Sequence, residues 1–211
     1  IAGICTAIGA AYAGNFAVTT TSGPGLSLKS EALGLAMITE LPLVLVDVQR
    51  SGPSTGIPTK TEQTDLHQAL YGRNGECPIM AMAAHSPSDC FEKAFYAGKF
   101  AMEHMMPVIL LTEGFLGNGS EPWKIPSMKD LPEIHPPFIN DASECGGKFA
   151  PFERDPETLV RRWARPGIPG LEHRVGGLEK NPAGVISSDP QNHQMMVDTR
   201  ARKVALVARD I

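Results

Sequence analysis

Apolar residues along the chain form two alternating patterns. Short, largely apolar runs predict strands that are buried on both faces, and these runs cover residues 16–21, 43–48, 79–83 and 108–112. Longer stretches with apolar residues at helical spacing lie at residues 1–14, 26–40, 59–71 and 86–105. Because strands and helices alternate, the pattern predicts an α/β fold with a doubly wound, mainly parallel sheet.

Local signals predict where some of these helices begin and end. Ser86 followed by Pro87 is typical of an N-cap and a first helical residue. Thr59 and Glu62 have the spacing of a capping box, which predicts that the third helix opens there. The first helix has small apolar residues on almost every side, so we expect it to be buried among its neighbours and to end at Gly14.

The composition changes after Glu113. Residues 114–190 are rich in proline and glycine and show little periodicity, which is also typical of a disordered linker. Five large aromatic residues argue against that alternative: Trp123, Phe138, Phe149, Phe152 and Trp163. We therefore predict three parts: an incomplete α/β domain at 1–116, an extended arm at 117–188, packed over the domain or over a partner, and a helix at 189–211 that leads towards a further domain.

Composition and charge exclude several classes of protein. The net charge of −4 and the lack of a basic run argue against nucleic acid as a partner. No apolar run reaches the roughly 18 residues that a membrane span needs. The four cysteines are scattered, and neither they nor the six histidines have the spacing of a metal site. We expect a cytoplasmic protein with no metal site of its own and no contact with membranes.

The loop after the second strand contains the most informative candidate, Arg50. It is a lone cation at the carboxyl end of a buried strand, where open α/β sheets bind ligands, and Ser51 and Thr55 add hydroxyl groups nearby. This pattern predicts a site for a small anion. A surface arginine paired with a carboxylate such as Asp47 fits the spacing equally well. Lys60, in the same loop, is either a second ligand for an anion or a solvated side chain.

A second loop, Ser22-Gly23-Pro24-Gly25, follows the first strand and leads into a helix. Its glycines allow close backbone approach, and the free N–H groups of a helix start attract polar atoms. The loop matches neither the dinucleotide nor the triphosphate fingerprint. Glu113, at the end of the fourth strand, either faces the same crevice or caps the following turn.

Several long segments together resemble a known family. Residues 20–28, 47–63 and 68–76, with residues 165–180 and 189–193 of the arm, are similar to the alpha subunit of 2-oxoacid:ferredoxin oxidoreductases. The likeness is greatest to the 2-oxoglutarate type, and it covers nearly the whole chain.

The resemblance implies a pyrimidine-binding domain for thiamine diphosphate, truncated at both ends. The cofactor would be shared with a beta subunit that carries the magnesium ion and an iron–sulfur cluster. The reaction would be oxidative decarboxylation of a 2-oxoacid, forming acyl-CoA, carbon dioxide and reduced ferredoxin. The glutamate that activates the cofactor is expected just upstream of Ile1. The resemblance also implies a hetero-oligomer, and it leaves open whether the chain self-associates as well.

The resemblance also suggests roles for the two loops. Arg50 would hold the carboxylate of the 2-oxoacid, with Ser51 and Thr55 beside it, and residues 22–25 would contact the cofactor. We add the hypothesis that Lys60 selects the distal carboxylate of 2-oxoglutarate. A generic nucleotide-binding α/β protein and a non-catalytic assembly subunit remain as alternatives.

Overall fold

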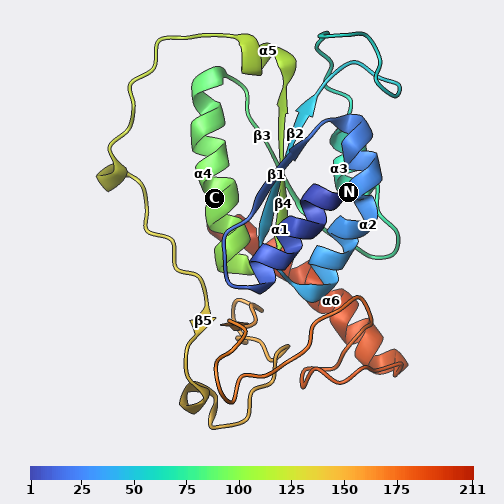
Figure 1. The fold of residues 1–211 in the computed structure, drawn as a ribbon, viewed down its shortest axis with the longest axis vertical. Coiled ribbons are helices and arrows are strands. Elements are labelled where there is room, and N and C mark those ends of the chain that lie inside the picture. Colours follow the sequence, from blue (N-terminus) through green and yellow to red (C-terminus); the bar gives the residue numbers. More distant parts are fainter.

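The computed structural model describes all 211 residues, and its centre is a parallel four-stranded sheet (Figure 1). The strands are β1 (Val18–Thr21), β2 (Leu43–Gln49), β3 (Met80–Ala83) and β4 (Pro107–Glu113). Their order across the sheet is β1-β2-β4-β3, and each neighbouring pair is parallel. The predicted parallel sheet is therefore confirmed.

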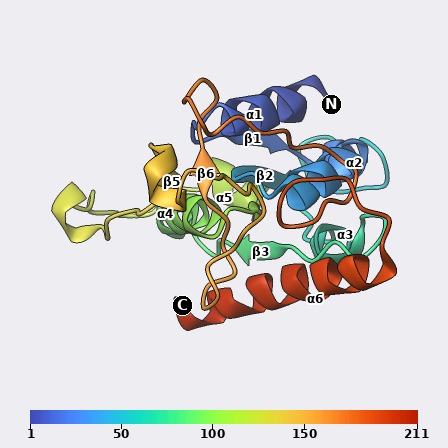
Figure 2. The same cartoon turned by 90° about the horizontal axis from the view of Figure 1, so that it is seen from below.

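Helices cover both faces of this sheet. They are α1 (Ala2–Tyr12), α2 (Gly23–Thr39), α3 (Leu66–Tyr71), α4 (Pro87–His104), the short α5 (Gly114–Asn118) and α6 (Pro190–Leu206). Figure 2 shows α4 on one face and α2 with α3 on the other, while α1 lies along the β1 side and α6 along the β3 side. This arrangement confirms the doubly wound α/β class. None of the helices combines the length and apolar character needed to cross a bilayer.

The two central strands form the core because nearly all their side chains are apolar. Leu43 and Leu45 of β2 and Val108 and Ile109 of β4 are all fully buried. Each such side chain contributes about 1.5–3 kcal/mol through its removal from water. β2 and β4 pair along their whole length, from Leu43 opposite Pro107 to Gln49 opposite Glu113. The carboxyl ends of both strands consequently lie at one edge of the sheet.

Helix borders follow the sequence signals in one case and depart from them in another. Ser86 caps α4 by accepting a hydrogen bond from Asp89 N at 3.3 Å, as predicted. The predicted capping box at Thr59 and Glu62 is wrong, because α3 begins only at Leu66. The Glu62 carboxylate instead accepts a hydrogen bond from Gly52 N at 2.7 Å, so it closes the preceding loop.

The first helix departs from its prediction in burial. Only one face of α1 is buried, through Ile4, Ala7, Ile8 and Ala11. The opposite face is exposed, because α1 covers the outermost strand β1 and no other element of these 211 residues packs on its outer side. The expectation of burial on almost every side is therefore wrong for this chain.

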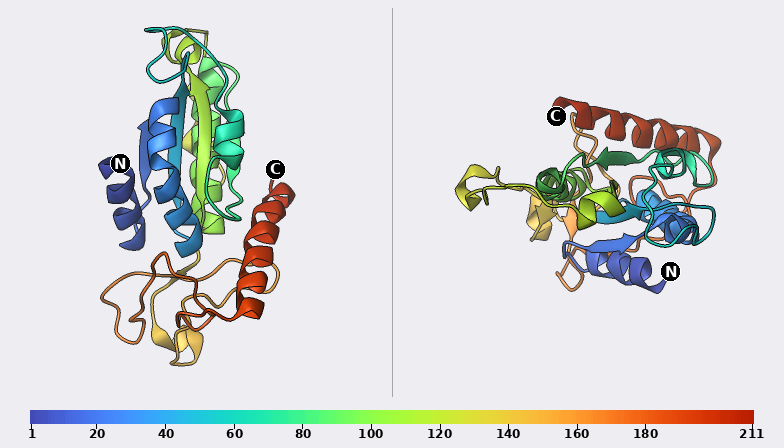
Figure 3. Two further views of the ribbon diagram at one scale, coloured as in Figure 1. Left: turned by 90° about the vertical axis from the view of Figure 1, so that its right-hand side faces the viewer. Right: turned by 90° about the horizontal axis from the view of Figure 1, so that it is seen from above.

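The segment between α5 and α6 follows an irregular path in two stages. It contains short elements only: η1 (Met128–Asp130), β5 (Phe138–Ile139), η2 (Ala142–Cys145) and β6 (Trp163–Ala164). The first stage runs outside α4, where Trp123 contacts Phe91 with ring centroids 5.3 Å apart. The second stage folds beneath the amino-terminal end of the sheet (Figure 3). There Trp163 is buried, and its indole N–H donates to Ala11 O at 3.0 Å.

A buried group of charges, which we call the base cluster, joins three segments at this amino-terminal end. It consists of Glu40, Arg154, Arg161 and Lys203. Glu40 ends α2 and forms ion pairs with Arg154 of the arm and with Lys203 of α6, whose Nζ lies 2.5 Å from Oε2. Lys203 Nζ also donates to Met105 O at 3.0 Å, and Arg161 donates to the carbonyl oxygen of the residue before Glu40.

The base cluster shifts the pKa of its members in ways that follow from burial and neighbours. Burial alone would raise the pKa of Glu40, but Lys203 and Arg154, with Arg161, hold it below its ordinary value. Burial lowers the pKa of Lys203 to about 8, although Glu40 opposes that change. The cluster therefore contains one carboxylate surrounded by cations, and it ties the arm and α6 to the sheet domain.

Candidate functional site

A polar hollow of about 540 Å³ lies beside the carboxyl ends of β1 and β2, and we call it the edge pocket. One wall is the first turn of α2, with Gly23, Pro24 and Ser27. The other walls come from the loop after β2, which begins with Arg50, and from residues 62–68 around the start of α3. Apart from the rings of Pro24 and Pro53, no apolar side chain lines it. The two loops that the sequence singled out thus meet at one pocket.

Arg50 enters the edge pocket with an unpaired guanidinium. No acidic side chain forms an ion pair with it, and its Nε is buried without a hydrogen-bond partner. Asp47, the alternative partner, is fully buried, and neither of its carboxylate oxygens accepts a hydrogen bond. The Arg50–Asp47 pairing is therefore wrong. An unpaired guanidinium in a polar pocket retains its capacity to bind a carboxylate through two parallel hydrogen bonds.

The loop that carries Arg50 is closed at its base by backbone contacts. Ser51 N donates to Lys60 O at 3.1 Å, and Gly52 N donates to the Glu62 carboxylate. Ser51 is almost fully buried and does not line the pocket, while Thr55 and Lys60 are exposed outside its walls. Of the four residues predicted to bind substrate, the structure places only Arg50 in the pocket.

The Ser22–Gly25 loop forms the start of α2. Ser22 is the N-cap residue, and its hydroxyl makes no capping hydrogen bond, so the N–H groups of Gly23 and Gly25 stay open, while Pro24 between them has no N–H. A methyl group on Gly23 would come within 2.7 Å of Asp65 Oδ2, and one on Gly25 would collide with the side chain of Thr21. Glycine is thus required where α2 approaches its neighbours. Gly23 and Pro24 line the edge pocket, whereas Ser22 and Gly25 lie just outside it.

Several polar residues that sequence reasoning missed line the pocket or support its walls. Asp65 N donates to Gln49 Oε1 at 3.1 Å, which connects the start of α3 to the end of β2. Gln68 of α3 donates to the hydroxyl of Ser27 on α2. One signal was available for Asp47, because a carboxylate interrupts the apolar run of β2. No pattern marks Gln68 or Ser27, since polar residues at helix starts are common.

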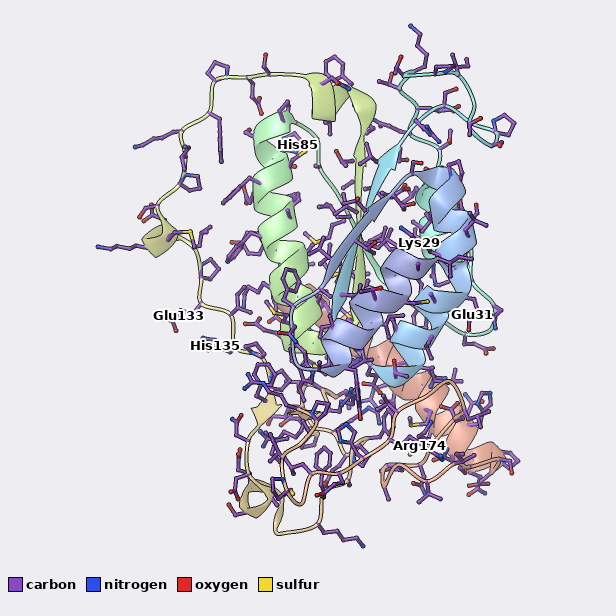
Figure 4. All side chains as sticks on the ribbon, viewed as in Figure 1. Lys29, Glu31, His85, Glu133, His135 and Arg174 are labelled. Carbon is purple, nitrogen blue, oxygen red and sulfur yellow. The ribbon has the colours of Figure 1, made fainter.

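Asp47 and Asp65 bring two carboxyl groups near each other at the pocket wall, because Asp47 projects from the same face of β2 as Gln49, whose Oε1 accepts from Asp65 N. Burial and the neighbouring Asp65 raise the pKa of Asp47 to about 7, although Lys29 acts in the opposite direction. Burial lowers the pKa of Lys29, whose Nζ donates to Thr20 O at 3.0 Å. Figure 4 shows Lys29 on α2 beside the sheet. One ammonium group and two carboxyl groups therefore lie together beside the pocket, and we call these three residues the pocket floor, although only Asp65 lines the pocket itself.

Other candidate ligands lie elsewhere in the fold. Glu113 is buried and accepts hydrogen bonds from Phe115 N at 2.8 Å and Leu116 N at 3.1 Å. The interpretation of Glu113 as a cap is therefore confirmed, and the crevice interpretation is wrong. No three acidic, histidine or cysteine side chains gather where they could hold a metal ion.

The chain is similar in sequence to several known proteins. Residues 1–187 match the model of the family described as pyruvate flavodoxin/ferredoxin oxidoreductase, thiamine diphosphate-binding. The chain is 58% identical over 205 residues to 2-oxoglutarate oxidoreductase subunit KorA of Mycobacterium tuberculosis, which covers 97% of the chain and 31% of that protein. It is 34% identical over 202 residues to 2-oxoglutarate synthase subunit KorA of Methanothermobacter marburgensis, covering 93% of the chain and 51% of that protein.

A solved structure shows the same fold. The 2-oxoglutarate:ferredoxin oxidoreductase from Magnetococcus marinus, solved with 2-oxoglutarate, coenzyme A and succinyl-CoA bound, superposes with a TM-score of 0.93 at 35% identity. The match covers 99% of this chain and 36% of that one. The chain thus spans a third to a half of the length of these relatives. It belongs to the thiamine diphosphate-binding family of pyruvate flavodoxin/ferredoxin oxidoreductases.

Proposed function

We propose that this chain forms one wall of the thiamine-dependent active site in a 2-oxoacid:ferredoxin oxidoreductase that acts on 2-oxoglutarate. The reaction is oxidative decarboxylation, which yields acyl-CoA, carbon dioxide and reduced ferredoxin. The observation that carries the proposal is the unpaired guanidinium of Arg50 in the polar edge pocket. Two relatives named for 2-oxoglutarate, and the solved structure with that acid bound, support the choice of substrate.

The residues present fit part of the cofactor. The open N–H groups at the start of α2 and the free hydroxyl of Ser22 suit the polar atoms of a neutral heterocycle such as the aminopyrimidine. The chain gathers no metal-binding group of side chains, so we assign the diphosphate and its magnesium ion to a partner subunit. When bound, thiamine diphosphate supplies the carbanion chemistry that decarboxylation of a 2-oxoacid requires.

Arg50 binds and orients the substrate in this scheme. Two parallel hydrogen bonds from its guanidinium fix the plane of the 2-oxoacid carboxylate. A hydrogen bond of this charged kind contributes about 1.5–3 kcal/mol. The contacts at Ser51 and Gly52 hold the loop, so the guanidinium is positioned before the substrate arrives. Lys60 lies opposite Ser51 at the closed base of the same loop, and we propose that it binds the distal carboxylate of 2-oxoglutarate.

The remaining components belong to other chains of the assembly. We propose that a beta subunit supplies the magnesium ion and the iron–sulfur cluster, and that the two subunits form a hetero-oligomer in the cytoplasm. Coenzyme A accepts the acyl group and ferredoxin accepts the electrons. Thr55, Ser51 and residues 22–25 remain proposed contacts with the substrate and the cofactor.

The experiment that tests this proposal compares Arg50 variants of the full-length subunit, assembled with its partner. Arg50→Ala should lower kcat/KM for 2-oxoglutarate by roughly 10- to 150-fold, the equivalent of about 1.5–3 kcal/mol. Arg50→Lys should lose less, because an ammonium keeps the charge but not the planar pair of donors. Arg174→Ala removes an exposed arginine of the arm and serves as the matched control (Figure 4). Unchanged turnover in Arg50→Ala would support a non-catalytic assembly subunit instead.

A further inference from the structure

The strongest unexplained feature is the pair of carboxyl groups at the wall of the edge pocket, where Asp65 lines the pocket and Asp47 lies behind it. Asp47 lies on β2 and is fully buried, and Asp65 is the N-cap residue of α3. Both oxygens of Asp47 and Oδ2 of Asp65 are buried without any hydrogen-bond partner. Buried polar atoms are normally paired, and an unpaired buried charge is costly. Two neighbouring carboxyl groups that lack donors can supply one to each other only if one of them is protonated.

The surroundings contain too little positive charge for two carboxylates. Lys29 of α2 is the only cation that acts on Asp47, and its Nζ already donates to a backbone carbonyl. On the neighbouring strands, Thr21 of β1 and Leu111 of β4 lie opposite Asp47 in register, and neither carries charge. With both carboxyl groups ionised, the floor would hold a net charge of −1. A single shared proton makes it neutral.

The pair is connected mechanically to the pocket above it. Asp65 lines the pocket and lies so close to Gly23 that a methyl group there would reach its carboxylate at 2.7 Å. Through its backbone N–H, Asp65 also holds Gln49 at the end of β2. Asp65 therefore contacts the two walls that carry the Ser22–Gly25 loop and Arg50. Repulsion between Asp47 and Asp65 would move α3 away from both walls.

We infer that Asp47 and Asp65 are positioning residues that share one proton and thereby hold the walls of the edge pocket in the geometry that binds a 2-oxoacid. The inference deepens the proposed function and rests on it for the identity of the ligand. Loss of the proton separates the pair and leaves an extra negative charge beneath a site for an anion. Both effects weaken binding of the substrate carboxylate, and neither involves a covalent step.

The test measures KM for 2-oxoglutarate against pH in the full-length, assembled enzyme. In the wild type, KM should rise roughly tenfold between about pH 6.5 and pH 8.5, as one proton is lost. In Asp47→Asn the rise should disappear, because the amide of asparagine donates at every pH. Asp65→Asn places the donor on the other side and should give the same flat profile, so the test does not depend on one variant. Asp130→Asn, at an exposed site on the arm, should keep the wild-type profile.

A spectroscopic readout separates this inference from the proposed function. Infrared difference spectra of the wild type should show the carbonyl stretch of a protonated carboxyl group that titrates near neutral pH, and Asp47→Asn should lack it. If Arg50→Ala retains full turnover while this band is present, only the proposed function fails. Absence of the band, or the same KM profile in wild type, Asp47→Asn and Asp65→Asn, overturns the inference.

Discussion

Charged side chains are paired at one end of the sheet and unpaired at the other. At the amino-terminal end, Glu40 of the base cluster forms ion pairs with Arg154 and Lys203. Each of these two cations also donates a hydrogen bond to a backbone carbonyl oxygen. At the carboxyl end, Arg50 and Asp47 have no ionic partner. The paired charges of the base cluster join segments of the chain. The unpaired charges at the carboxyl end remain available to bind a ligand or a proton, which is expected of a binding site.

The largest effect is expected at the base cluster. Glu40→Gln removes the one carboxylate beside two buried cations and the nearly buried Arg154, and loss of one partner of a buried ion pair costs about 3–5 kcal/mol. Urea unfolding would measure this as a loss of free energy of unfolding. Glu31→Gln, on the exposed face of α2 (Figure 4), should change it by less than about 0.5 kcal/mol. Equal stability in both variants would contradict the structural role of the cluster.

The next effect concerns the pH dependence of stability. The pKa of Asp47 rises from 3.8 to about 7 on folding, so the native state holds a proton that the unfolded chain has released. The free energy of unfolding should therefore fall as pH increases from about 4 to about 7, by at most about 1.4 kcal/mol per pH unit. In Asp47→Asn this contribution disappears, and the variant should exceed the wild type in stability above pH 7. Denaturant unfolding of both proteins over this pH range measures the difference. Parallel plots of the free energy of unfolding against pH for the wild type and Asp47→Asn would contradict the prediction.

A smaller effect on stability is expected at Arg50. Because its guanidinium has no ionic partner, Arg50→Ala should change the free energy of unfolding by no more than about 0.5 kcal/mol. The same variant is expected to lose most of its turnover, so stability and activity should separate. A loss of stability comparable with that of Glu40→Gln would show that Arg50 is structural, and the contrast between the two ends of the sheet would fail.

The last prediction concerns substrate binding and tests substrate choice. Lys60 closes its loop through the backbone carbonyl, which alanine retains, and its side chain is exposed. Lys60→Ala should raise KM for 2-oxoglutarate several-fold, about 1 kcal/mol for an exposed ion pair, and should leave KM for pyruvate nearly unchanged. Lys148→Ala, an exposed lysine of the arm, is the control. Equal changes in KM for both substrates would show that Lys60 does not bind the distal carboxylate.

The sequence predicted the features that depend on local pattern. The parallel sheet, the Ser86 cap and the meeting of the Arg50 loop with the Ser22–Gly25 loop all follow from periodicity and from the rule that ligands bind at strand ends. The start of α3 was missed because Glu62 has the spacing of a capping residue but binds Gly52 instead. Spacing describes which bond is possible, while the fold decides which bond forms.

Features built from distant residues could not be predicted. Glu40 finds its partners 114 and 163 residues further along the chain, and no local signal marks such a pairing. Asp65 is similar, because its importance comes from its closeness to Gly23 and Gln49 on other elements. The irregular arm offered only its aromatic content, which indicated packing but not the path beneath the sheet.

The closed base of the Arg50 loop has a consequence for how such enzymes diversify. Ser51 and Gly52 fasten the loop to residues 60 and 62, so the tip between them extends from a fixed frame. Under the function proposed above, exchanging that tip would change which 2-oxoacids are accepted and would leave Arg50 in place. Under that proposal, substrate range and carboxylate recognition can change independently within one short stretch of backbone.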